Sequence, residues 1–167
     1  TFAHSRMVFQ SKSVTDRVIT VHHDKKSELY KNLQSQLESL LEGEDNFVAN
    51  MANTASLFYH EMNKHEYFDG AINWFGFYLL DLKKKSLEKD NKDENKKQCK
   101  ELVLGPFQGL VACTRIRFDR GVCGHCATTE QVVIVPNVHE FPGHIACDSA
   151  SNSEICVPLF NKSGQLI

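Results

Sequence analysis

This chain of 167 residues has no run approaching the roughly 18 consecutive apolar residues that a membrane-spanning helix needs. Near its first residue it also lacks the apolar segment that a secretory signal carries. Both absences favour the cytoplasm, a reducing compartment in which cysteines stay as thiols unless they do chemistry. The sequence therefore predicts no membrane partner.

An excess of basic charge is missing as well. The formal net charge is −2, and the one Lys-rich run, residues 83–100, is interleaved with acidic residues. A nucleic-acid partner usually requires a concentrated basic face, so none is expected here. We interpret the Lys-rich run as a solvated insertion in the turn of a hairpin.

The composition is that of a globular domain with a core, since 41% of residues are hydrophobic and 24% are charged. Leucine spacing predicts a helix that begins at Ser27 and stops near Gly43, and a second helix follows from about Asn46. Short apolar runs then predict mostly hairpin-linked strands at 72–80, 101–104, 110–116, 132–135 and 154–160, with a short helix at 122–129. This order indicates an α+β fold, a central antiparallel sheet with helices on its faces.

The expected domain boundaries follow from the same pattern. Residues 1–25 show no sustained period and are expected to form an N-terminal extension of low order, ahead of a single domain over 26–167. The chain stops inside a predicted strand at 165–167, so we expect the domain to be truncated there.

Cysteine is the most informative residue type, because four of six cysteines crowd into residues 121–156. They are Cys123, Cys126, Cys147 and Cys156, and Cys113 lies just upstream. A structural disulfide scaffold is disfavoured, because such scaffolds belong to small secreted domains. Two closely spaced pairs, Cys123 with Cys126 and His144 with Cys147, would suit a zinc site of three sulfurs and one nitrogen.

Thiol redox catalysis is the third chemistry that this cluster admits. The C-x2-C pair lacks the βαβ context of a thioredoxin-like motif. Cys147 has a neighbourhood that could activate a thiol, with His144 three residues before it, Asp148 directly after it and Glu154 nearby. The residues alone leave zinc binding and thiol catalysis open.

Six ordered segments of the chain resemble the free methionine-(R)-sulfoxide reductases, which are built on a GAF domain. The segments include Gly-Val-Cys-Gly and His-Ile-Ala-Cys-Asp, and they span residues 36–44, 50–53, 73–79, 102–109, 121–124 and 144–154. The resemblance implies a GAF-like fold over residues 26–167. It also implies that the C-terminal strand and helix of the family, with two pocket Asp residues, are missing here.

The resemblance further implies an enzyme that reduces free methionine (R)-sulfoxide. Cys147 matches the catalytic nucleophile, and Cys123 and Cys113 match the family's two other redox cysteines; we rank Cys123 first as resolving partner and Cys113 second. Thioredoxin would reduce the resulting disulfide with electrons from NADPH, and no metal, flavin or nicotinamide is bound. A homodimer is implied too. Cys99, Cys126 and Cys156 match no family role.

The remaining site residues are assigned by role. Glu154 best matches the acid that protonates the sulfoxide oxygen, and Asp148 is the second choice. Trp74 and Tyr78 are expected to wall the methyl-sulfinyl end of the substrate, whereas Phe75 and Phe77 are assigned to the core. Backbone N–H groups at Ser149, Ser151 and Ser153 are expected to bind the substrate carboxylate.

Two other functions remain as alternatives. A non-catalytic GAF module that senses a small ligand would use the same pocket, because a fold does not dictate a function. It gives no reason for Cys113, Cys123 and Cys147 to be present together. The second alternative is a zinc-stabilised interaction module.

Overall fold

The computed structural model describes residues 8–11, 23–81, 100–145, 147 and 149–167 of the chain. The elements, in chain order, are β1 (Val8–Ser11), α1 (His23–Leu41), α2 (Phe47–Lys64), β2 (Ile72–Leu80), β3 (Glu101–Gly109), β4 (Arg115–Arg117), α4 (Gly121–Thr129), β5 (Val133–Val135), the 3-10 helix η2 (Val138–Glu140) and β6 (Ser153–Cys156).

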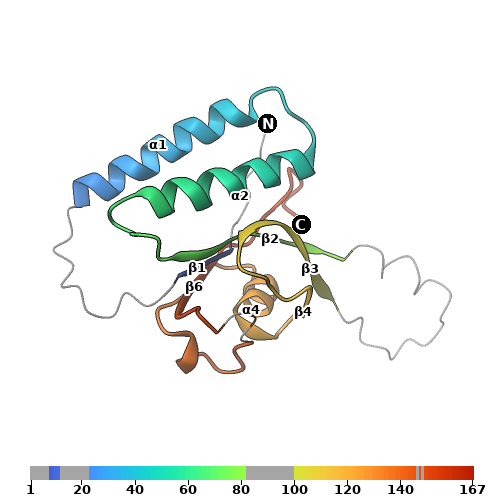
Figure 1. Cartoon of the computed structure of the whole chain (residues 1–167). Helices are drawn as coiled ribbons and strands as arrows, with labels where there is room; N and C mark the ends of the chain where they lie inside the picture. Colours follow the sequence, from blue (N-terminus) through green and yellow to red (C-terminus); the bar gives the residue numbers. More distant parts are fainter. Residues whose placement is uncertain (1–7, 12–22, 82–99, 146, 148) are drawn as a thin grey trace, which may run out of the picture.

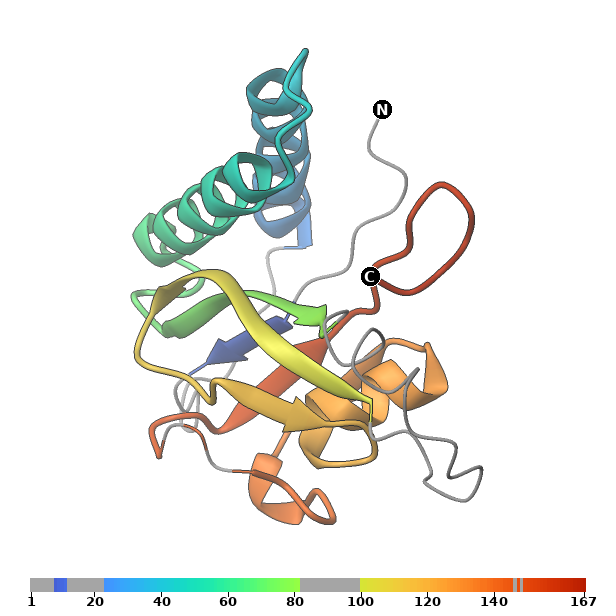
Figure 2. The same cartoon turned by 90° about the vertical axis from the view of Figure 1, so that its right-hand side faces the viewer.

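The described strands form one antiparallel sheet in the order β4-β3-β2-β1-β6-β5. Helices α1 and α2 lie on one face of this sheet and α4 lies on the other (Figures 1 and 2). The predicted α+β fold, an antiparallel sheet with helices on its faces, is confirmed.

Strand β2 shows how the two faces are built. Phe75 and Phe77 pack with Met51 and Ala55 of α2, whereas Trp74 packs with residues of α4 such as Val122. Successive side chains of a strand point to opposite faces, so the continuous aromatic run supplies both layers of the core. The assignment of Phe75 and Phe77 to the core is confirmed.

A side-chain cap and a glycine with positive φ mark two of the helix ends. The Asn46 side chain caps α2 by accepting a hydrogen bond of 2.9 Å from the backbone N–H of Ala49. Just after α1, Gly43 adopts a positive φ of 75°, a backbone conformation that favours glycine. The predicted helix start at Ser27 is wrong, because α1 already begins at His23.

Several predicted ranges differ from the structure, among them the strand expected at 101–104, which continues to Gly109. Residues 8–11, placed in the low-order extension, form strand β1 and pair with both β2 and β6 near the middle of the sheet. The strand expected at 110–116 is only Arg115–Arg117, and the one expected at 154–160 is Ser153–Cys156. The Lys-rich run at 83–100 lies almost wholly outside the described residues.

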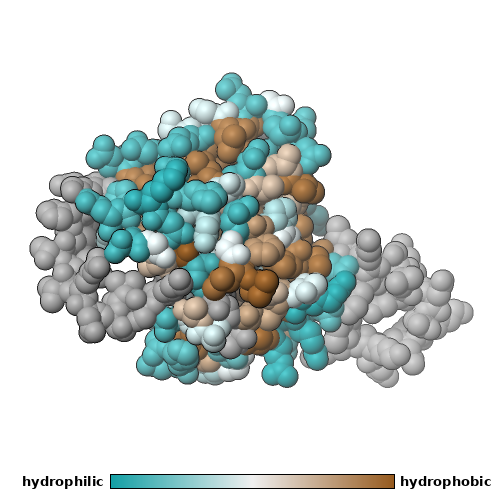
Figure 3. Space-filling view, in the orientation of Figure 1, coloured by the Kyte–Doolittle hydropathy of each residue, from teal (hydrophilic) through white to brown (hydrophobic). Residues whose placement is uncertain are grey.

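None of the helices in the described part of the chain has the length and apolarity needed to cross a bilayer. Figure 3 shows hydrophilic side chains over the outer surface of α1 and α2, with apolar side chains gathered below them over the sheet.

Candidate active site

Cys147 lies in the loop that leads to β6, and it is joined by a disulfide to Cys113 in the loop that follows β3. The two Cα atoms are 5.3 Å apart, a usual separation for a disulfide. The Tyr78 hydroxyl donates a hydrogen bond of 2.7 Å to the backbone carbonyl of Cys113. Tyr78 thereby ties the Cys113 loop to strand β2 beside it.

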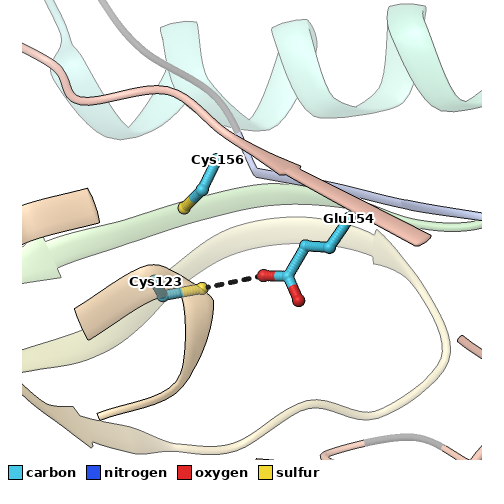
Figure 4. A group of neighbouring side chains, drawn as sticks. All are labelled: Cys123, Glu154 and Cys156. Carbon is cyan, nitrogen blue, oxygen red and sulfur yellow. Dashed lines mark hydrogen bonds between the residues drawn. The ribbon is translucent and has the colours of Figure 1, made fainter. Parts of the chain in front are cut away.

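The pairing of Cys147 with Cys123, ranked first from the sequence, is not the pairing in the structure. Cys123 is a free, buried thiol in the first turn of α4. Its sulfur points toward β6, where it lies near Glu154 and Cys156 (Figure 4). The loop after β3 instead carries Cys113 to Cys147, so the second-ranked cysteine is the partner.

Glu154 projects from β6 and is only 5% exposed. Its Oε1 accepts a hydrogen bond of 3.3 Å from the Cys123 sulfur (Figure 4), and its Oε2 lies 4.0 Å from Nε2 of His144. Burial, followed by the charge of His139, lowers the pKa of His144. At neutral pH the ring is therefore neutral, and its contact with Glu154 is not an ion pair.

Several pKa values around Glu154 are shifted. A hydrogen bond with Cys156 lowers the pKa of the Cys123 thiol, but burial and the Glu154 carboxylate outweigh it, so the net pKa is raised. Burial also raises the pKa of Tyr78 well above its usual range, and the charges of Cys123 and Glu154 add to that rise. Both groups are therefore neutral at physiological pH, and Cys123 is a poor nucleophile.

A pocket brings most of the predicted residues together. It is lined by Trp74, Tyr78, Cys123, Cys147 and Glu154, with Ile145 beside them. Trp74 is 2% exposed, and its ring stacks on that of Tyr78 at a centroid distance of 5.9 Å. The aromatic wall is thus continuous with the core, because Trp74 belongs to the buried cluster and Tyr78 packs against it.

The first turn of α4 also lines the pocket, through Gly121 and Val122, together with the preceding Arg120. In the sequence this segment is recognised only as a motif. The signal that could have identified it is that Gly-Val-Cys-Gly begins a helix, and the N-terminus of a helix presents N–H groups suited to an anion.

The three serines expected near the substrate carboxylate do not line this pocket. Ser151 is buried, and its hydroxyl accepts a hydrogen bond of 2.9 Å from the Asn73 side chain. It therefore connects the β6 loop to strand β2. Ser149 is exposed and Ser153 begins β6. Asp148, the second-choice acid, lies outside the described residues.

The zinc set that the sequence left open as an alternative is not assembled, because Cys147 is in the disulfide. Among the described residues, a different group could hold a metal ion: Cys123, Glu154 and Cys156, whose ligand atoms all lie within 4.8 Å of one another.

No family model matches this chain. It is 44% identical over 138 residues to the free methionine-R-sulfoxide reductase of Escherichia coli, covering 83% of this chain and 69% of that protein. The Saccharomyces cerevisiae protein of the same name is 39% identical over 142 residues, covering 85% of this chain and 69% of that protein.

Solved structures that resemble this chain include a protein of the same name. A free methionine-R-sulfoxide reductase from Neisseria meningitidis, in complex with its substrate, is 38% identical with a TM-score of 0.68. The match covers 95% of this chain and 75% of that one. A putative GAF sensor protein from Burkholderia vietnamiensis is 45% identical with a TM-score of 0.67, and that match covers 85% of this chain and 75% of the other. The predicted GAF-like fold is confirmed.

Proposed function

The chain belongs to the family of free methionine-R-sulfoxide reductases, and on that premise we propose that it reduces free methionine (R)-sulfoxide to methionine by thiol catalysis. The observation that carries the proposal is the shared pocket, which Cys147, Glu154 and the aromatic pair Trp74 and Tyr78 all line. These are a thiol for attack, an acid for the leaving oxygen and a wall for the methyl-sulfinyl group.

In the first step, the Cys147 sulfur attacks the sulfoxide sulfur while Glu154 supplies a proton to the sulfoxide oxygen. The oxygen is transferred to Cys147, which becomes a sulfenic acid, and methionine leaves. The substrate gains two electrons and Cys147 loses two. Protonation by a positioned acid is needed because a bare sulfoxide oxygen is a poor leaving group.

In the second step, the Cys113 thiol attacks the Cys147 sulfenic acid, which forms the disulfide and releases water. The Cα separation of 5.3 Å supports this pairing over the one with Cys123. A dithiol such as that of thioredoxin then reduces the disulfide by exchange, and NADPH supplies the electrons indirectly. We place this cycle in the cytoplasm, where such a dithiol is available.

Substrate binding uses both ends of the amino acid. Trp74 and Tyr78 offer aromatic surface to the methyl and sulfur groups. At the other end, we assign the substrate carboxylate to the first turn of α4 at Gly121 and Val122, in place of the serines.

The test is turnover of free methionine (R)-sulfoxide with thioredoxin, its reductase and NADPH. Cys147→Ser is expected to abolish NADPH oxidation, because serine cannot form the sulfenic acid. A matched control is Cys126→Ser, which removes a thiol that does not line the pocket and is expected to keep most of the activity. Turnover that survives in Cys147→Ser would contradict the mechanism and favour a non-catalytic, ligand-sensing GAF module.

A further inference from the structure

Three buried side chains gather at the substrate pocket, and two of them, Cys123 and Glu154, line it. Cys123 comes from α4, and Glu154 and Cys156 come from β6, two residues apart and therefore on the same face of the strand. Their two sulfurs and the carboxylate converge (Figure 4), with all ligand atoms within 4.8 Å of one another. Cys156 is a free thiol, 3% exposed, to which the reductase cycle assigns no role.

This geometry is close to that of a bound thiophilic cation. With zinc–sulfur bonds of about 2.3 Å, two sulfurs of a tetrahedral site lie about 3.8 Å apart. Separations within 4.8 Å therefore need only small inward movements of the ligands. Thiolates select soft or borderline cations such as Zn²⁺ over Mg²⁺ or Ca²⁺, and a carboxylate completes many zinc sites.

We propose that the reduced chain binds one thiophilic divalent cation through Cys123, Cys156 and Glu154, and that the bound cation inhibits the enzyme. The inhibitory part rests on the proposed function, because the cation would occupy Glu154, the proposed acid. On binding, the two thiols become thiolates and release their protons to solvent.

A route for the cation is present. Cys123 and Glu154 both line the substrate pocket, so an ion that enters the pocket meets two of its three ligands there. A further thiol is nearby, because Cys126 lies one helical turn after Cys123 on α4 and is buried in the same core cluster as Cys156. An ion at this position faces the substrate pocket, so it also stands in the way of the sulfoxide.

The first test measures Zn²⁺ binding to the reduced, desalted chain under anaerobic conditions, by competition with a chromogenic chelator. We expect one ion per chain, with binding at least tenfold weaker in Cys156→Val, which keeps an apolar side chain of similar size. Cys113→Ser is the matched control and should bind as the wild type does. Unchanged binding in Cys156→Val, binding lost in Cys113→Ser, or no binding by the wild type would overturn the proposal.

A second measurement applies even if Cys156→Val does not fold, which its circular dichroism without metal would show. Cd²⁺ added to the reduced wild-type chain should give a thiolate charge-transfer band whose intensity corresponds to at least two thiolates. It should persist in Cys113→Ser, and a band that disappears there would place the ion at the redox pair instead.

The inhibitory part is tested by single-turnover methionine formation, because the reduced chain alone then supplies the electrons. One equivalent of Zn²⁺ should suppress methionine formation in the wild type and leave Cys156→Val active. Binding without suppression would overturn inhibition alone. Binding by a chain that forms no methionine even without Zn²⁺ would contradict the proposed function but not the metal site.

Discussion

Tyr78 shows how a single hydroxyl can position a redox cysteine. Its ring stacks on buried Trp74, and its hydroxyl donates to the Cys113 carbonyl at 2.7 Å. The sequence predicted that both aromatics belong to the site, but nothing in it identified this hydrogen bond, which joins residues 35 positions apart.

Replacing Tyr78 by Phe should therefore destabilise the fold. The change leaves the Cys113 carbonyl without this donor, so the free energy of unfolding should fall by about 1 kcal/mol. Urea denaturation of the reduced chain measures the loss. Tyr59→Phe, on α2, is the comparison that removes a hydroxyl elsewhere. Equal stability of Tyr78→Phe and the wild type would contradict the role assigned to this bond.

Glu154 is the second residue on which the mechanism depends. Glu154→Gln keeps the shape and removes the acid, so kcat for methionine (R)-sulfoxide should fall by roughly 10²–10⁴-fold, the usual contribution of a positioned acid. Glu140→Gln is the matched control, because Glu140 is exposed, does not line the pocket and accepts a hydrogen bond from the Asn137 side chain. A drop of less than threefold in Glu154→Gln would show that another group protonates the oxygen.

The sequence predicted which residue types meet in the pocket, but not which thiols face each other. Cys147, Glu154, Trp74 and Tyr78, which the sequence assigns to one site, line the same pocket. The ranking of Cys123 ahead of Cys113 as the partner of Cys147 was wrong. The pairing depends on the direction in which α4 and the loop after β3 point their side chains. Sequence spacing does not carry that information.

At the scale of elements, α4 depends on close packing of its backbone. A Cβ added to Gly124 would lie far inside van der Waals contact with the carbonyl oxygen of Arg117, at the end of β4. Glycine at this position therefore lets α4 approach β4 closely. Because Cys123 directly precedes Gly124, this close approach also sets the position of the Cys123 thiol.

Gly124→Ala should consequently destabilise the chain by about 1–3 kcal/mol, the usual cost of overpacking. The sign of this change in stability tests the close packing, because replacing glycine by alanine in an unobstructed helix stabilises the helix by roughly 0.5–1 kcal/mol. Thermal unfolding followed by circular dichroism gives the answer. A rise in melting temperature would contradict the packing described for α4.

The accuracy of the predicted elements depended on how much each one relies on distant partners. The aromatic strand 72–80 and the helix at 122–129 were predicted within a residue of their bounds, because each carries a strong local pattern. Strand β1 was missed: Val8–Ser11 is short, and what makes it a strand is pairing with β2 and β6, far along the chain.

At the scale of the whole molecule, the disulfide connects two loops on different parts of the sheet. It closes a separation of 34 residues, from Cys113 to Cys147. A cross-link of that span restricts the unfolded chain and should stabilise the fold by about 3–4 kcal/mol.

The oxidised chain should accordingly unfold at a higher urea concentration than the reduced chain. In Cys113→Ser the two treatments should give the same midpoint, because this disulfide cannot form. Denaturation curves with and without a phosphine reductant make the comparison. A difference that persists in Cys113→Ser would assign the stabilisation to another bridge.

The central claim is that Cys147 accepts the substrate oxygen as a sulfenic acid and that Cys113 then attacks this sulfenic acid to form the disulfide. The most direct measurement treats the reduced chain with one equivalent of free methionine (R)-sulfoxide, quantifies methionine, and maps disulfides by mass spectrometry of the alkylated peptides. We predict one methionine and one Cys113–Cys147 disulfide per chain, with the (S)-sulfoxide giving neither. Methionine formed while Cys147 remains an alkylatable thiol, or a bridge from Cys147 to Cys123, would contradict the account.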